Sequence, residues 1–270
     1  MLPFDQDEVR RYGVSWSALR LCLVRRAQVK TFQRADGIIF LSQHARETIV
    51  KMAGPLAGKT MTIPHGVDAR FRRSPSEQKP ISEYSEQKPF RILYVSVVNL
   101  YKHQWHVVDA VARLREKGFP IQVDLVGAAW PQAMRLLQQA MQKHDPQGHF
   151  VHYHGRLPYA ELPGHYQRAD AFVFASSCEN LPNILLEAMA AGLPIACANR
   201  GPMPEVAGDA VVFFDPEEPE DIARALAQLL SDPDLRATNA RIASERARLY
   251  SWDRCATETF RFLHEIAAGA

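Results

Sequence analysis

From residue 90 onward, short apolar runs alternate regularly with segments of helical periodicity. The apolar runs are 91–98, 121–127, 150–155, 171–174, 195–198 and 210–214. The helical segments are about 103–117, 131–143, 159–168, 182–192, 218–230, 234–249 and 252–267. This alternation favours an α/β domain with a doubly wound parallel sheet and right-handed crossovers. Ligands of such sheets bind beyond the carboxyl ends of the strands.

One strand–helix unit carries two carboxylates around its turn. Glu179 follows the apolar run 171–174, and Glu187 lies inside the helix that starts near Pro182 and stops near Gly192. Proline is tolerated in a first helical turn, and glycine suits the residue after a helix. A rise of about 1.5 Å per residue separates the two carboxylates by on the order of 10 Å.

The first turn of that helix lies between the two carboxylates and contains Leu181, Pro182, Asn183 and Ile184. Unpaired backbone N–H groups and the positive end of the helix dipole can hold a phosphate there. An anion site with a carboxylate on each side is suited to a nucleotide sugar. The phosphates would lie at the helix tip, and hydroxyl groups would bind to the two carboxylates. Spacing alone fits equally well a strand–helix turn with two solvated glutamates.

The composition is that of a globular protein. Of the 270 residues, 47% are hydrophobic and 23% are charged, and the net charge of +2 argues against bulk nucleic-acid binding. No apolar run reaches the roughly 18 residues that span a bilayer. The start of the chain has neither the basic end nor the apolar core of a signal peptide. The four scattered cysteines are interpreted as reduced residues, which predicts a cytoplasmic location.

Residues 1–35 are predicted to be helical and carry seven basic against three acidic residues. The region 10–34 mixes apolar and basic residues at helical spacing. Two interpretations stay open: a helix that lies peripherally on the inner face of an anionic membrane, and a core helix with a solvated basic face. The next segments predict a strand at 37–41, a helix over 43–52 capped by Ser42, and a strand at 60–64.

Residues 72–89 contain a polar tandem repeat. Ser76-Glu77-Gln78-Lys79-Pro80 recurs as Ser85-Glu86-Gln87-Lys88-Pro89. The repeat has no apolar period to bury, so it is interpreted as a flexible linker.

Two stretches resemble one protein family. The sequence from Glu179 through Glu187 to Pro194, with its Pro, Glu-Ala-Met and Gly-x-Pro in register, closely resembles the donor-site motif of retaining family-4 (group 1) glycosyltransferases of the GT-B fold. Residues 35–42 and 63–68 are similar to the end of the N-terminal GT-B domain and its exit into the linker.

The resemblance implies a division of the chain. Residues 1–71 are expected to be a partial N-terminal GT-B segment, and 72–89 the linker. Residues 90–250 are expected to be the Rossmann-like donor-binding domain, and 251–270 a helix that returns to the N-terminal segment.

The resemblance also implies roles for individual residues. Lys102 matches the lysine that binds donor phosphates, Glu187 the glutamate that binds the nucleotide ribose, and Glu179 the catalytic glutamate near the transferred sugar. The family's second cation is missing from 96–101, and His103 replaces its usual glycine. Losing one cation should weaken diphosphate binding. No cofactor or metal is implied, because the lysine and helix-tip amides take the place of a metal.

The activity implied is transfer of a hexose, with retention, from a UDP- or GDP-linked donor to a glycan or lipid-linked acceptor in polysaccharide, lipopolysaccharide or glycolipid assembly. The strand, Gly-rich loop and further βα units with which such an N-terminal domain usually begins are not found before residue 35. The alternative is therefore a non-catalytic sugar-nucleotide-binding module that needs a partner chain for the acceptor site.

Overall fold

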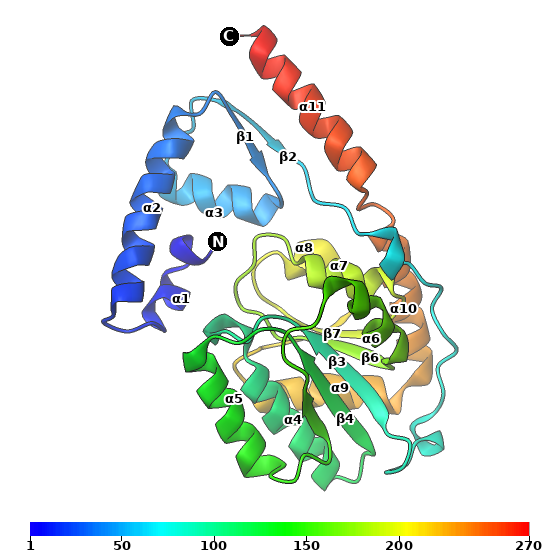
Figure 1. The fold of residues 1–270 in the computed structure, drawn as a ribbon. Helices are drawn as coiled ribbons and strands as arrows, with labels where there is room; N and C mark the ends of the chain where they lie inside the picture. Colours follow the sequence, from blue (N-terminus) through cyan, green and yellow to red (C-terminus); the bar gives the residue numbers. More distant parts are fainter. Residues whose placement is uncertain (270) are drawn as a thin grey trace.

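The larger part of the molecule is built on a six-stranded, all-parallel sheet (Figure 1). The computed structural model describes residues 1–269. The strands lie in the order β5-β4-β3-β6-β7-β8. They are β3 (Phe90–Val95), β4 (Ile121–Val126), β5 (Val151–Tyr153), β6 (Ala171–Phe174), β7 (Ile195–Ala198) and β8 (Val212–Phe214). The order confirms the predicted doubly wound sheet, and its direction of winding reverses between β3 and β6.

Helices cover both faces of this sheet, as Figure 1 shows. On one face α4 packs between α5 and α9, and on the other α7 packs against α10. The helices are α4 (Gln104–Glu116), α5 (Pro131–His144), α6 (Leu162–Arg168), α7 (Asn183–Ala190), α8 (Met203–Ala207), α9 (Pro219–Ser231) and α10 (Pro233–Ala247). Short 3-10 turns precede two of them, η4 (Leu100–Lys102) before α4 and η5 (Tyr159–Glu161) before α6.

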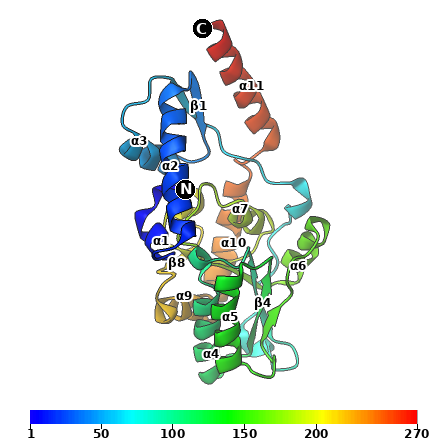
Figure 2. The same cartoon turned by 60° about the vertical axis from the view of Figure 1, so that its left-hand side comes forward.

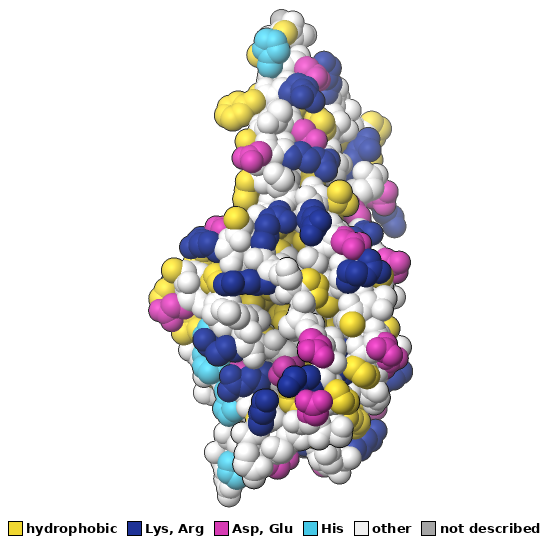
Figure 3. Space-filling model, turned by 90° about the vertical axis from the view of Figure 1, so that its right-hand side faces the viewer, with side chains coloured by type: hydrophobic (Ala, Val, Ile, Leu, Met, Phe, Trp, Pro, Cys, Tyr) yellow, Lys and Arg dark blue, Asp and Glu magenta, His cyan; other side chains and the backbone are white. Residues whose placement is uncertain are grey.

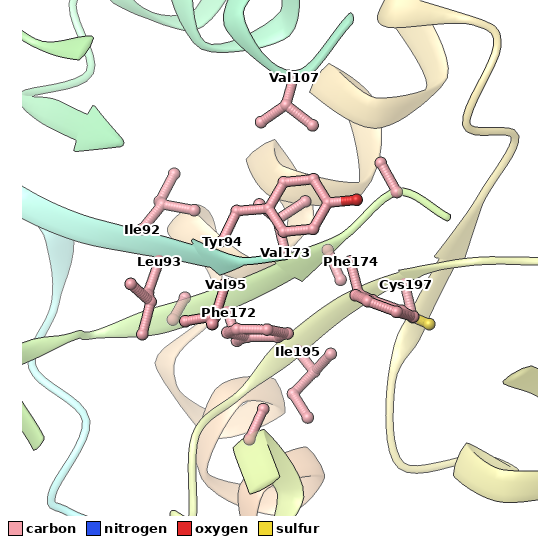
Figure 4. Close-up of a cluster of buried hydrophobic side chains, with 14 of the residues drawn as sticks. Ile92, Leu93, Tyr94, Val95, Val107, Phe172, Val173, Phe174, Ile195 and Cys197 are labelled. Atoms are coloured by element: carbon pink, nitrogen blue, oxygen red, sulfur yellow. The ribbon is translucent and has the colours of Figure 1, made fainter. Parts of the chain in front are cut away.

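The central strands form the hydrophobic core (Figure 4). Every residue of β6 and β7 is buried, as expected for strands with helices on both faces. Tyr94 of β3 and Phe174 of β6 pack edge to face, with ring centroids 6.0 Å apart. This packing holds β3 beside β6 and sets the position of the two loops that leave their carboxyl ends.

The N-terminal segment (residues 1–71) is a smaller α/β unit with its own core. Its elements are η1 (Leu2–Phe4), α1 (Gln6–Arg10), α2 (Trp16–Arg34), β1 (Gly37–Phe40), α3 (Gln43–Ala53), β2 (Lys59–Thr62) and η2 (Ala69–Phe71). Strands β1 and β2 pair in parallel as a two-stranded sheet. The predicted cap is confirmed, because Ser42 Oγ accepts a hydrogen bond of 3.1 Å from the Ala45 N–H. Helix α11 (Trp252–Ala268) runs back to this unit and packs on β1 (Figure 1).

Helix α2 packs one side on the small core and leaves the rest exposed. Val29 and Phe32 pack against the core of this unit, as expected for a helix with a solvated basic face, although no residue of α2 is fully buried. Trp16, Leu19 and Leu23 are exposed together with the basic side chains, and Figure 2 shows α2 on the outside of the molecule. No helix within residues 1–269 is long and apolar enough to cross a membrane.

The segment 72–89 is fastened to the larger domain, which corrects its interpretation as a freely flexible linker. The guanidinium of Arg236, on α10, is fully buried and donates to Gln78 Oε1 and to the Lys79 carbonyl. Tyr84 donates to Asp170 at 2.9 Å. The physical reason is that carbonyl and amide oxygens of a polar segment can satisfy a buried cation without any apolar period. On the face that carries this segment, basic and acidic side chains are interspersed (Figure 3).

Candidate functional site

Lys102 and Glu179 meet where the winding of the sheet reverses. Lys102 leaves the carboxyl end of β3 through η4, and Glu179 lies in the loop after β6. Because these strands are neighbours, the two loops are adjacent, and Lys102 Nζ and Glu179 Oε1 form an ion pair. Only 7% of the lysine and 15% of the glutamate side chain are exposed. Lys102 is therefore not a solvated surface lysine.

Further contacts hold this ion pair in place. Ser176 Oγ donates to the same Glu179 oxygen at 2.6 Å. The ammonium group of Lys102 lies 5.1 Å from the ring centroid of Phe174, on its face. The charge of Lys102 is thus compensated by Glu179, and an incoming anion would have to compete for it.

His103 adopts a left-handed backbone conformation with φ of 49° at the start of α4. Glycine enters this region without strain, which gives a physical reason for the family's glycine at this position. The ring is fully buried, and its Nε2 lies 2.9 Å from Ser177 Oγ. Burial lowers the pKa of His103 to about 3, so the ring is neutral. Ser177 Oγ in turn donates to Glu8 Oε1 at 2.5 Å.

Glu187 is buried on α7, with 6% of the residue exposed. Two tyrosines donate to its carboxylate, Tyr159 to Oε1 at 3.1 Å and Tyr166 to Oε2 at 3.0 Å. Burial raises the pKa of Glu187 to about 7, against the lowering effect of the two hydrogen bonds, and the nearby Asp68 raises it further. The carboxylate is therefore poised between its neutral and ionised forms near neutral pH.

This pKa predicts a measurable loss of stability with rising pH. The folded protein holds the Glu187 proton up to about pH 7, whereas the unfolded chain releases it near 4.5. Between these values the folded state binds more protons, so the free energy of unfolding falls as pH rises. The raised pKa corresponds to a contribution on the order of 3 kcal/mol, present below about pH 4.5 and lost above about pH 7. Urea denaturation at several pH values should show this decrease in the wild type relative to Glu187→Gln. Parallel curves for the two proteins would contradict it.

The four residues at the tip of α7 have different environments: Asn183 and Ile184 begin the helix, and Leu181 and Pro182 precede it. Leu181 and Pro182 are buried, Ile184 is half-buried and Asn183 is exposed. Pro182 precedes α7 without a side-chain cap, as an anion site at the helix tip requires. The Asn183 N–H, however, already donates to the Leu181 carbonyl at 3.0 Å, so the tip offers fewer free donors than the sequence predicted.

The N-terminal segment closes over the loop that carries Glu179. Ser42 Oγ donates to the Asn180 carbonyl at 2.7 Å. Both carboxylate oxygens of Glu205, on α8, accept hydrogen bonds from the first turn of α3, from the N–H groups of Gln43 at 2.8 Å and His44 at 2.9 Å. The segment therefore presents its surface directly to the candidate site.

A cavity of about 250 Å³ lies at this junction, and Glu179 forms part of its wall. Polar side chains from both sides line it, namely those of Asp5, Gln6, His44, Thr48, Ser177 and Arg200. Sequence reasoning missed these residues. Arg200 follows the carboxyl end of β7, so the strand-end rule could have found it; the N-terminal residues gave no such signal.

Tyr159 and Tyr166 were also missed, because no local pattern connects them with Glu187. A further tertiary contact joins β4 to the end of β5. Asp124 of β4 lies 2.7 Å from Nε2 of His154, which directly follows β5. Within the described residues no group of three or more His, Cys, Asp or Glu side chains is arranged to hold a metal ion.

Comparisons with known proteins identify the class of this chain. Residues 76–246 match the family described as glycosyl transferases group 1, and the chain belongs to this family. Its fold is GT-B. The structure is similar to that of sucrose-phosphate synthase from Thermosynechococcus elongatus, with a TM-score of 0.81 at 22% identity over 97% of this chain and 66% of that one. It is also similar to Anabaena HepE in complex with UDP and glucose, with a TM-score of 0.77 at 22% identity over 95% of this chain and 69% of that one.

Two curated relatives illustrate the range of sequences that match. O-antigen chain mannosyltransferase B of Escherichia coli is 27% identical over 234 residues, 85% of this chain and 61% of the relative. Glycogen synthase of Mycobacterium tuberculosis is 28% identical over 230 residues, 84% of this chain and 53% of the relative. The chain thus spans between half and two thirds of the length of these relatives.

Proposed function

We propose that this chain transfers a hexose from a nucleotide-linked donor to a glycan or lipid-linked acceptor, with retention of configuration. The observation that carries the proposal is the convergence of Lys102 and Glu179 at the reversal point of the sheet, beside the uncapped tip of α7. A cation, a carboxylate and helix-tip amides at one place suit a sugar diphosphate. No metal is needed in this scheme, because Lys102 and the amides neutralise the leaving group.

Each residue has a defined role in this proposal. Lys102 binds the donor phosphates, with Leu181, Pro182, Asn183 and Ile184 around them, and Glu187 binds the ribose. Glu179 contacts the transferred sugar, so that it leaves Lys102 when the diphosphate arrives. The acceptor hydroxyl then attacks on the face from which the phosphate departs. The protein contributes positioning and charge stabilisation rather than a covalent step.

The acceptor would enter the cavity between the N-terminal segment and the Glu179 loop. Its volume of about 250 Å³ suits a group of monosaccharide size, and its lining supplies polar donors and acceptors. The relatives support a role in cell-surface polysaccharide, lipopolysaccharide or glycolipid synthesis: one is named an O-antigen chain mannosyltransferase, and another a GDP-mannose-dependent phosphatidylinositol monomannoside mannosyltransferase. We propose GDP or UDP as the donor nucleotide and the cytoplasm as the location.

A thermal-shift and calorimetry screen with UDP, GDP and their sugars tests the donor site. We expect one nucleotide to raise the Tm by several degrees at a concentration about 100 times its Kd, which corresponds to roughly 2.7 kcal/mol of stabilisation. The absence of any stabilisation at millimolar nucleotide would refute the proposal. ADP serves as the control for a nonspecific diphosphate effect.

The second candidate function is a non-catalytic sugar-nucleotide-binding module that requires a partner chain. The incomplete burial of the N-terminal segment favours it. Its sheet has only two strands, and α2 leaves Trp16, Leu19 and Leu23 exposed, an apolar surface that a partner chain can cover. Nucleotide binding without transfer to any acceptor, restored by a second chain, would favour this alternative.

The same face of α2 supports peripheral membrane contact through the region 10–34. Its exposed apolar side chains lie among arginines, a combination that suits an anionic lipid surface. Cosedimentation with vesicles containing anionic lipid tests this contact. Equal recovery with neutral and anionic vesicles would argue against it.

A further inference from the structure

Two tyrosines cover Glu187. Both of its oxygens accept hydrogen bonds from tyrosine hydroxyls, and only 6% of the residue is exposed. Each oxygen has a second lone pair, but so little of the residue is exposed that a ribose reaches this carboxylate, as the proposed function requires, only when one of the two covering tyrosines moves. The inference below rests on that proposed function and deepens it.

The two tyrosines differ in how firmly they are held. Tyr166 is 1% exposed, stacks on Phe172 with ring centroids 5.6 Å apart, and packs edge to face on Phe71 at 5.3 Å. Its ring is enclosed by the core, and its hydroxyl supports Glu187 from inside. Because moving this ring would disrupt the core, Tyr166 is not the group that gives way.

Tyr159 is held less firmly than Tyr166, because nearly half of it is exposed. It lies in the short turn η5 and is 47% exposed. Its ring contacts Phe71 at a centroid distance of 5.5 Å and lies under the guanidinium of Arg70 at 5.2 Å. An exposed aromatic side chain can change rotamer without opening a cavity in the core.

We propose that the Tyr159 hydroxyl occupies on Glu187 the position of a ribose hydroxyl, and that nucleotide binding displaces it. A phenol and a ribose hydroxyl both donate one O–H to a carboxylate, so the exchange conserves the hydrogen bond to Oε1. Tyr159 is thereby a competitor of the donor and sets its affinity. It also connects the nucleotide site to the exit of the N-terminal segment, because Asp68 holds the Arg70 side chain at 2.8 Å over the Tyr159 ring.

The test compares Tyr159→Phe with the wild type by calorimetry at about pH 9, where Glu187 is ionised in both proteins. The probes are UDP and GDP and the 2′,3′-dideoxy forms of the same diphosphates. We expect Tyr159→Phe to bind the ribonucleotide roughly two- to tenfold more tightly, the ratio that one net hydrogen bond represents. The affinity for the dideoxy form should not change, because that ligand makes no demand on Glu187.

Tyr84→Phe is the matched control, since Tyr84 also donates to a buried carboxylate, Asp170, but away from this site. It should leave both affinities unchanged. Equal or weaker ribonucleotide binding by Tyr159→Phe would overturn the inference while leaving the donor site in place. If the wild type binds neither UDP nor GDP, the proposed function fails, and the inference fails with it.

Discussion

Replacing Glu179 by Gln should lower the rate of sugar transfer by a factor of about 10² to 10⁴, whereas the affinity for the bare nucleotide should stay the same or increase. The reason is the ion pair with Lys102. A neutral amide at position 179 removes the carboxylate that contacts the transferred sugar. It also leaves the buried ammonium group without a counter-charge, so that a diphosphate meets less competition there.

Glu187→Ala should have the opposite pattern. It removes the carboxylate proposed to bind the ribose, and charge-assisted hydrogen bonds of this kind contribute about 1.5–3 kcal/mol, or roughly 10- to 100-fold in affinity. Calorimetry measures the affinity of both variants for UDP and GDP. The rate at which free nucleoside diphosphate is formed from the sugar donor measures transfer. Equal loss of nucleotide binding in the two variants would refute this division of roles.

Replacing Arg236 by Met should lower the free energy of unfolding by about 3–5 kcal/mol, because each buried acceptor that loses its donor costs about 1–3 kcal/mol. The guanidinium is fully buried, and burial lowers its pKa. It donates to Gln78 Oε1 at 3.0 Å and to the carbonyls of Lys79, Leu229 and Leu230. Loss of these donors leaves buried carbonyl groups unpaired and detaches the segment 72–89 from α10.

Guanidinium chloride denaturation measures the change in stability, and limited proteolysis measures the release of 72–89. Arg241→Met is the matched control, because Arg241 lies on the same helix, is exposed, and pairs only with Glu245 on the surface. That substitution should change the free energy of unfolding by less than about 0.5 kcal/mol. Similar denaturation curves for the two variants would show that the buried hydrogen bonds do not fasten the segment.

Much of the fold could be predicted because its signals are local. The strands β3 to β8 follow from apolar runs, and the cap at Ser42 follows from one side chain and the N–H three residues later. Helix α8 was not predicted, since its five residues are too few for a helical period. The sequence left two interpretations of α2 open, because a mixed apolar and basic pattern does not reveal which of the apolar side chains are packed and which are exposed.

The candidate site was predicted in part, for a similar reason. Glu179, Glu187 and the tip of α7 belong to one strand–helix unit, so their proximity is contained in a short stretch. Lys102 could be assigned to the same cleft from its place after a strand, but its pairing with Glu179 could not. The tyrosines on Glu187 come from another loop and a different helix, and no spacing in the sequence connects them with it.

The sequence alone therefore determined the α/β class, the approximate positions of most helices and the carboxylate–helix tip–carboxylate unit, because periodicity and capping depend on residues a few positions apart. The tertiary structure decided how the charges of that unit are compensated and how far its carboxylates are exposed. Lys102 compensates Glu179 across 77 residues, and Tyr159 and Tyr166 cover Glu187 across 28 and 21 residues. These contacts depend on which strands become neighbours where the sheet reverses direction, and strand order is set by the packing of the whole domain.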